Sequence, residues 1–271
     1  MLAGSADRSN AFCDAVGYIT PMDVLIVGAG AMGTWFGDAV DSEVAFADVD
    51  PAAAVAAADA VGGEAASLED EGTYDVVCIA VPLSHADEAI AAHASRAGEA
   101  MVDVSGAMTD PLAAMARHAP DLERASLHPL FAPERAPGSI AVVRENAGPT
   151  TVAVLEALED RGNDLVETTP EEHDEAMETV QSATHAAVLA FALAAEDVPE
   201  GFETPIYEEL RGLASRVTAG TPRVYADIQE TFDGAEAVAD AAGALADADH
   251  DEFEALYAEA ARKLHEEGDH E

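Results

Sequence analysis

The sequence is poor in basic residues. It has 12 Lys and Arg against 54 Asp and Glu, which gives a formal net charge of −42 at pH 7, and Lys263 is its single lysine. Nucleic acids and anionic membrane surfaces are bound by basic faces, because their phosphates carry negative charge. The composition therefore argues against a nucleic acid or a membrane surface as a partner.

Cysteine and long apolar runs are also scarce. Cys13 and Cys78 are too few for a disulfide framework, and Cys78 lies in an apolar run, which indicates a reducing, cytoplasmic environment. No apolar run reaches the roughly 18 residues of a membrane span. The first 21 residues lack the apolar stretch of a signal peptide. We expect residues 1–21 to be a disordered tail or the product of a start codon assigned too early.

Aromatic residues make up only 5% of the chain, yet hydrophobic residues make up 49% and the mean hydropathy is +0.03. A disordered acidic chain would lack this much apolar material. We therefore expect a folded core beneath a very acidic surface. Such a surface repels itself in dilute buffer, whereas salt near 1 M shortens the Debye length to roughly 3 Å. The hypothesis is a halophilic protein that works in molar salt.

Short apolar runs alternate with Ala-rich helical stretches between Met22 and Thr168. Continuous apolar strands between helices are typical of a parallel sheet covered on both faces. The pattern predicts an α/β fold over residues 22–168, a doubly wound, mostly parallel Rossmann sheet. The seven expected strands lie at residues 24–28, 44–48, 75–81, 101–105, 125–128, 140–143 and 164–168.

After Thr168 the pattern becomes helical. Thr169, Pro170 and Glu172 read as a capping box with proline at the first helical position. One long helix should follow through about residue 196, and the remaining segments show helical periodicity without strand runs. The sequence predicts an all-helical second domain over residues 169–271.

A glycine motif follows the first expected strand. The segment Gly28-Ala29-Gly30-Ala31-Met32-Gly33 matches G-x-G-x-x-G between a strand and a helix, the context that dinucleotide binding requires. The three glycines allow the tight turn, the close approach of the pyrophosphate and the close packing of helix on strand. The helix N-terminus, at Ala31 and Met32, supplies N–H donors and the positive end of its dipole.

An acid stands at the end of the second expected strand. Asp48 follows the first glycine of the motif by 20 residues, where a carboxylate binds ribose hydroxyls and repels a 2′-phosphate. This favours NAD over NADP, with the neighbouring Asp50 as the other candidate. Val81 and Pro82 end the next long strand beside the expected cofactor cleft, and His85 is expected to begin a helix there.

Three further blocks follow the glycine motif. They are Ser126-Leu127-His128-Pro129-Leu130-Phe131-Ala132-Pro133; Glu172-His173-Asp174-Glu175-Ala176-Met177 with Val180-Gln181 and His185; and Pro205-Ile206-Tyr207 with Arg216 and Tyr225-Ala226-Asp227-Ile228. Together with the glycine motif, these blocks resemble the prephenate dehydrogenase family, here in a halophilic archaeal type, in order and spacing over roughly residues 22 to 230.

The resemblance implies a reaction. Prephenate would be oxidised by NAD and decarboxylated to 4-hydroxyphenylpyruvate in tyrosine synthesis. The ring becomes aromatic as hydride leaves C4 and the carboxylate leaves as CO2, so the enzyme needs a base, a fixed nicotinamide and cationic anchors. In relatives the helical domain forms a homodimer and the active site lies in the cleft between the domains.

His128 is the expected base. It ends a strand at the edge where Rossmann folds bind ligands, its ordinary pKa of about 6.5 suits proton transfer, and the matching family histidine has this role. One departure lies nearby. Where many relatives have D-x-x-S-x-K, this chain places Gly106 at the serine and Met108 at the lysine. Ser105, displaced by one residue, either bonds the substrate or the nicotinamide, or caps the next helix. Prephenate and its amino counterpart arogenate both stay open.

Three residues match the family's substrate pocket. Arg216 matches the arginine that binds the substrate carboxylate, although an arginine on this chain could also form a surface ion pair. His185 reads by periodicity as a core histidine, and the resemblance places it near the substrate side chain. Tyr225 either reaches the pocket, from its own or the partner subunit, or packs in the core.

Two other functions fit part of the pattern. A related Rossmann reductase acting on a different acid would share the glycine motif without needing His128. A non-catalytic NAD-binding regulator would carry Ser105-Gly106 as the trace of a lost site. The remaining histidines show no metal-ligand spacing, so no metal is expected.

Overall fold

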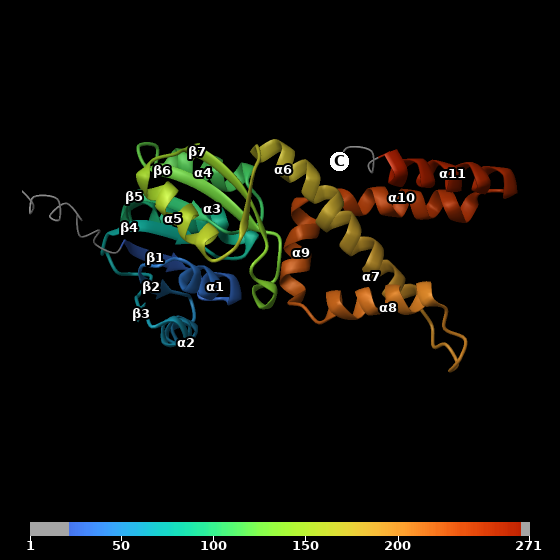
Figure 1. The fold of residues 1–271 in the computed structure, drawn as a ribbon, viewed down its shortest axis with the longest axis horizontal. Coiled ribbons are helices and arrows are strands. Elements are labelled where there is room, and N and C mark those ends of the chain that lie inside the picture. The colour runs from blue at the N-terminus through green and yellow to red at the C-terminus, as the bar shows by residue number, and fades with distance from the viewer. Residues whose placement is uncertain (1–21, 267–271) are drawn as a thin grey trace, which may run out of the picture.

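The computed structural model describes residues 22–266, so the expected tail at residues 1–21 lies outside the described part. Eight strands form one sheet in the order β3-β2-β1-β4-β5-β6-β7-β8 (Figure 1). β6 and β7 pair antiparallel and every other neighbouring pair is parallel. The strands are β1 (Asp23–Val27), β2 (Glu43–Ala47), β3 (Glu64–Ala65), β4 (Tyr74–Ile79), β5 (Ala97–Asp103), β6 (Glu123–Pro129), β7 (Ser139–Asn146) and β8 (Asp164–Glu167).

The seven expected strands are confirmed, and so is the Rossmann-type, mostly parallel sheet. The two-residue β3 was not expected, because a pair of exposed residues leaves no apolar run to detect. Strand side chains alternate between the faces of the sheet. Val24 and Ile26 of β1 enter one buried cluster, and Leu25 and Val27 enter the other.

Helices cover both faces. The first cluster is completed by side chains of α1 (Ala31–Ala39), α2 (Pro51–Val61) and α5 (Pro149–Asp160), and the second by side chains of α3 (Ala86–His93) and α4 (Thr109–His118). Burying a Val, Leu, Ile or Phe side chain contributes about 1.5–3 kcal/mol to the stability of the fold. The helices on the two faces thus hold the sheet in place, and the carboxyl ends of its strands carry the site.

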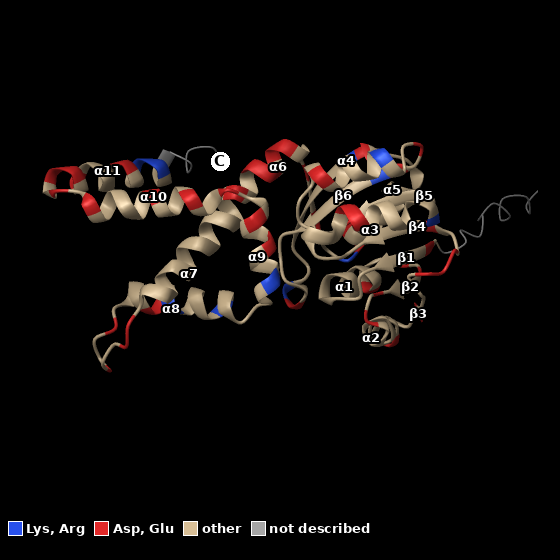
Figure 2. Cartoon of the chain, turned by 180° about the vertical axis from the view of Figure 1, so that it is seen from behind, with Lys and Arg blue, Asp and Glu red and all other residues tan. Residues whose placement is uncertain are grey.

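The remainder of the described chain is helical. Its helices are α6 (Pro170–Met177), α7 (Thr184–Ala194), α8 (Pro205–Thr218), α9 (Pro222–Thr231), α10 (Gly234–Asp247) and α11 (His250–Glu266). In Figure 1, α6 and α7 lead away from the sheet, α8 turns back beside α7, and α10 and α11 lie side by side. Figure 2 shows acidic positions spread over both regions and few basic ones. Within residues 22–266, no helix has the length and apolarity that a membrane crossing requires.

The long helix expected after Thr169 is interrupted. Thr169 Oγ1 accepts the N–H of Glu172 at 3.2 Å and Pro170 is the first helical residue, as predicted. Between α6 and α7, however, lies a π-helical turn, η4 (Glu178–Ala183). A π turn loosens the regular bonding of a helix and is frequent at functional sites. Here Gln229 of α9 donates to the Ser182 carbonyl at 2.9 Å, so a neighbouring helix supports the turn.

Candidate active site

The glycine turn after β1 has the shape of a dinucleotide cradle. Gly28 has φ of +106°, a conformation that favours glycine, and a Cβ on Gly33 would come within 2.0 Å of the Gly28 carbonyl oxygen. A Cβ on Gly30 would meet nothing within 4 Å. Two glycines are therefore required by the fold, while the third leaves open space at the N-terminus of α1. Ala31 and Met32 begin that helix, as expected.

Asp48 and Asp50 have different partners. Asp48 Oδ2 accepts the N–H of Ala29 within the glycine turn at 2.8 Å. Asp50 Oδ1 accepts the N–H of Ala52 at 3.0 Å and so caps α2. The Asp50 carboxylate serves the helix, which leaves Asp48 as the acid oriented at the glycine turn.

The segment after β4 lies against the same turn. A Cβ on Gly28 would be 2.4 Å from the Ala80 carbonyl oxygen and 3.0 Å from the Val81 nitrogen. Pro82 follows and leads into a 3-10 turn, η1 (Leu83–His85). Val81 and Pro82 therefore lie at the edge that was expected to hold the cofactor.

His128 belongs to a chain of hydrogen bonds. Its Nδ1 lies 2.9 Å from His173 Nε2, and His173 Nδ1 lies 2.8 Å from Asp174 Oδ1. Asp174 also accepts the N–H groups of Met108 and Thr109, each at 3.0 Å. On the other side, the Gln181 amide nitrogen lies 3.1 Å from His128 Nε2. The π turn supplies Gln181, so the interruption of the long helix is part of this site.

The proton positions follow from Asp174. Burial favours a raised pKa for this carboxyl, but hydrogen bonds from His173, Thr109 and Met108 outweigh burial and hold its pKa below the ordinary value. An ionised carboxylate only accepts, so neutral His173 carries its proton on Nδ1 and accepts at Nε2. His128 then carries its proton on Nδ1. Its Nε2 has the lone pair, which accepts from the Gln181 amide.

His128 itself resists protonation. Its side chain is buried, and this burial lowers its pKa well below the ordinary value of 6.5. A positive charge on His173 would lower this pKa further, whereas Asp174 acts in the opposite sense. At neutral pH the imidazole is therefore uncharged. The arrangement is that of a proton acceptor whose reactive nitrogen is fixed by two residues behind it.

The Ser105 hydroxyl is bonded to a neighbouring carboxylate. It donates to Asp103 Oδ2 at 2.5 Å. Burial raises the pKa of Asp103 to about 6, against the hydrogen bonds from Ser105. Gly106, with φ of +96°, is the residue beside His128, since a Cβ there would lie 3.4 Å from His128 Nε2. The reactive nitrogen thus faces a position without a side chain.

The three expected substrate ligands lie on three helices. His185 of α7 and Tyr225 of α9 meet edge to face, with ring centroids 4.8 Å apart. The buried Nδ1 of His185 has no hydrogen-bond partner within the described part of the chain, and burial lowers the pKa of this histidine. Arg216 is exposed in the last turn of α8 and forms no ion pair with any described residue. The structure therefore brings His185 and Tyr225 into contact with each other.

The roles of His173 and Asp174 were not predicted. Both residues stood in the E-H-D block, but their sequence separations of 45 residues from His128 and 66 from Met108 carry no local signal. Gln181 belongs to the same block, whose pattern indicates no separate role for it. Nothing in the helical periodicity marks the π turn that directs Gln181 to His128.

Comparison with known proteins identifies the group to which the chain belongs. No protein-family model matches it. It is 33% identical over 274 residues to 4-amino-4-deoxyprephenate dehydrogenase of Streptomyces pristinaespiralis, covering 90% of this chain and 92% of that protein. It is 27% identical over 179 residues to a probable arogenate/prephenate dehydrogenase of Methanocaldococcus jannaschii, covering 60% of this chain and 40% of that protein.

Among solved structures, the fold is similar to prephenate dehydrogenase from A. aeolicus in complex with hydroxyphenyl propionate and NAD+. The TM-score is 0.67 at 15% identity, over 93% of this chain and 94% of that one. The shared sheet and helical region agree with the sequence likeness to the Streptomyces protein, which extends over nine-tenths of both chains. The chain belongs to the prephenate/arogenate dehydrogenase family.

Proposed function

We propose that this protein oxidises a prephenate-type cyclohexadiene with NAD and releases the ring carboxylate as CO2. The observation that carries the proposal is the chain of contacts from Asp174 through His173 to His128 Nδ1, which assigns the lone pair to His128 Nε2. Such a nitrogen takes the proton of the C4 substituent while the ring becomes aromatic. The Gln181 amide now on that nitrogen must be displaced by the substrate.

The pair behind His128 explains how a histidine with a low pKa acts as a base. As Nε2 accepts the substrate proton, the proton on Nδ1 passes to His173 Nε2, 2.9 Å away. The positive charge then rests beside the Asp174 carboxylate rather than on His128. Proton affinity is thereby set by the whole chain of groups, and not by the buried imidazole alone.

The cradle fits a nicotinamide dinucleotide. A bound dinucleotide supplies the hydride acceptor. Open space at Gly30 admits the pyrophosphate to the N-terminus of α1, and the Asp48 carboxylate supports NAD, because it repels a 2′-phosphate. For the substrate, we propose that Arg216 binds a carboxylate, with His185 and Tyr225 beside the side chain.

A second candidate substrate class has an amine at C4 in place of the hydroxyl. Gly106 offers no hydroxyl donor at His128 Nε2, and the Ser105 hydroxyl is bonded to Asp103. His128 Nε2 is an acceptor, and the Gln181 side chain beside it carries a carbonyl oxygen as a second acceptor as well as its amide donor. An amine has N–H donors for both, whereas a hydroxyl has one. The 33% identity to a 4-amino-4-deoxyprephenate dehydrogenase supports this candidate.

The two substrate classes are separated by turnover. The protein in molar KCl is mixed with NAD and with prephenate, arogenate or 4-amino-4-deoxyprephenate, and absorbance at 340 nm and CO2 release are followed. Equal formation of NADH and CO2 supports the proposed reaction, and the ratio of kcat/KM values assigns the C4 substituent. NAD binding without turnover of any of the three favours a non-catalytic regulator instead.

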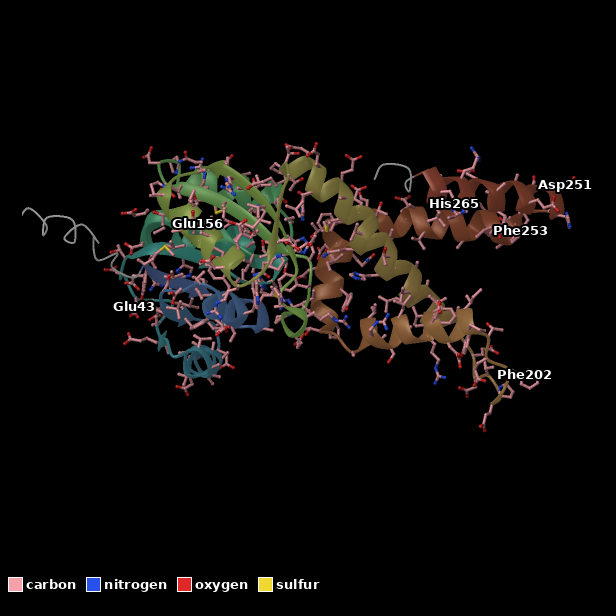
Figure 3. All side chains as sticks on the ribbon, viewed as in Figure 1. Glu43, Glu156, Phe202, Asp251, Phe253 and His265 are labelled. Carbon is pink, nitrogen blue, oxygen red and sulfur yellow. The ribbon has the colours of Figure 1, made fainter. Side chains whose placement is uncertain are left out.

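We also propose a homodimer formed through the helical region. Large apolar side chains stay exposed there, including Leu193 (88%), Ile206 (78%) and Tyr257 (70%). Figure 3 places Phe202 and Phe253, also exposed, at the end of the molecule away from the sheet. Exposed apolar groups gathered in one region are typical of an interaction surface. Light scattering in KCl should give about 56 kDa, twice the chain mass of 27.9 kDa; a monomer would contradict the proposal.

A further inference from the structure

Arg223 is a cation without a carboxylate partner at the junction of the sheet and the helical region. Its Nη2 lies 2.6 Å from His85 Nε2 and 3.4 Å from Ser84 Oγ. No Asp or Glu oxygen among residues 22–266 comes within ion-pair distance of its guanidinium. Arg211 and Arg216 of the helical region likewise form no ion pair with a described residue, but Arg223 also contacts η1 across the junction.

The junction does not depend on Arg223. Leu83 of η1 packs against the buried cluster that Ile228 and Phe232 form with residues across the junction. The Ser84 hydroxyl donates to Asp227 Oδ2 at 3.4 Å, which adds a second link between η1 and α9. Arg223 is exposed at the start of α9. Since apolar packing already joins the two elements, a structural role does not account for this side chain.

The position of η1 directs Arg223 toward the cofactor edge. The turn begins three residues after Ala80, whose carbonyl oxygen lies against Gly28 in the glycine cradle. Rossmann folds bind their ligands at this carboxyl edge of the sheet. Arg223 therefore brings a positive charge from the helical region to the side of the sheet where anionic ligands are expected.

The present partner of Arg223 is an imidazole nitrogen and not an oxyanion. A guanidinium only donates, so His85 Nε2 is the acceptor in this contact. A guanidinium bonds an oxyanion about twice as strongly as a neutral acceptor, and it can do so bidentately. An oxyanion that reached η1 would therefore compete with His85 and Ser84 for the guanidinium.

We propose that Arg223 leaves His85 to bind an oxyanion of the ligands held between the two regions. The oxyanion is either a phosphate of the dinucleotide or a carboxylate of the substrate. This inference rests on the proposed function, because it requires that a dinucleotide and an acidic substrate bind. It gives the site a cation in addition to Arg216.

The test compares Arg223→Gln with Arg211→Gln, a matched loss of one exposed arginine on α8. The Kd for NADH without substrate is measured by titration calorimetry in 2 M KCl, and the substrate KM is measured at saturating NAD. A rise of about tenfold or more in Kd assigns the phosphate, and the same rise in KM alone assigns the carboxylate. Arg223→Lys keeps the charge without the planar fork, so it should lie between the wild type and Arg223→Gln.

Values for Arg223→Gln within twofold of those for Arg211→Gln in both assays would overturn the inference, even if the unfolding temperature fell. Should Arg223→Gln fail to fold, Arg223→Lys decides, with wild-type values in both assays counting against the inference. If the wild-type protein bound no NADH at all, the proposed function would fail and this inference with it.

Discussion

Asp174→Asn tests the chain of hydrogen bonds behind His128. The carboxylate accepts three N–H groups at 2.8–3.0 Å, from His173 Nδ1 and from the backbone of Met108 and Thr109. An asparagine amide group cannot accept all three, because one of its two terminal atoms is a donor. With its oxygen in the place of Oδ1, the asparagine keeps the bonds from His173 and Met108, and its NH2 meets the Thr109 N–H. With its oxygen in the place of Oδ2, it keeps the Thr109 bond alone, and its NH2 faces His173 and the Met108 N–H.

Both orientations remove the negative charge that stabilises a protonated His173, so the chain of groups behind His128 accepts the substrate proton less readily. In the orientation with the NH2 facing it, His173 also moves its proton to Nε2 and donates to His128 Nδ1. The His128 proton then lies on Nε2, which cannot accept the substrate proton. We expect kcat to fall about 10²–10⁴-fold, which corresponds to about 3–5 kcal/mol of transition-state stabilisation.

The assay is steady-state kinetics in 2 M KCl with Glu175→Gln as the matched control, since Glu175 is an exposed acid on the same helix. Asp174→Asn should keep the Kd for NADH, because Asp174 lies outside the glycine cradle. Nitrogen chemical shifts of the His128 ring distinguish the two orientations, because only the second moves the ring proton to Nε2. A kcat within threefold of the control would refute the proposed role of Asp174.

Three further predictions follow from the charges of the site. Arg216→Gln should raise the substrate KM about 10–100-fold through the lost bidentate pair and leave the Kd for NADH unchanged; an unaltered KM would leave Arg216 as a surface residue. Asp103 has its pKa raised from 3.8 to about 6 in the fold, so its contribution to stability is complete below about pH 4 and is lost as the pH rises through about 6. Asp103→Asn should therefore gain up to about 3 kcal/mol over wild type at pH 8 and much less at pH 4, measured by chemical unfolding; an equal difference at both pH values would contradict this. The KM values for NAD and substrate should fall between 0.5 M and 3 M KCl, because salt screens the repulsion between an acidic surface and two anions; a constant KM over the range where the fold is intact would speak against it.

The sheet was predictable because its signals are local. Apolar runs mark the buried strands, the glycine motif marks the first turn, and Thr169 with Pro170 marks the start of α6. The antiparallel pairing of β6 with β7 leaves no comparable signal, because a buried strand reads alike in either direction.

The site was predictable only in part, because its contacts are long-range. His128 was expected from its place at the end of a strand and from the family resemblance. Its link to His173, and the contact of Arg223 with His85 across 138 residues, depend on how the helical region lies on the sheet. Ser105 was considered for the substrate, yet a carboxylate two residues away takes its hydroxyl. The sequence pattern does not show which of several hydrogen-bond partners a side chain will take in the fold.

The most direct test of the account is His128→Asn. With wild-type protein forming NADH and CO2 from its preferred prephenate-type substrate, the variant should keep the wild-type Kd for NADH and lose about 10²–10⁴-fold in kcat, the usual range for removal of a general base. Near-normal turnover by a folded variant would contradict the claim that His128 takes the substrate proton.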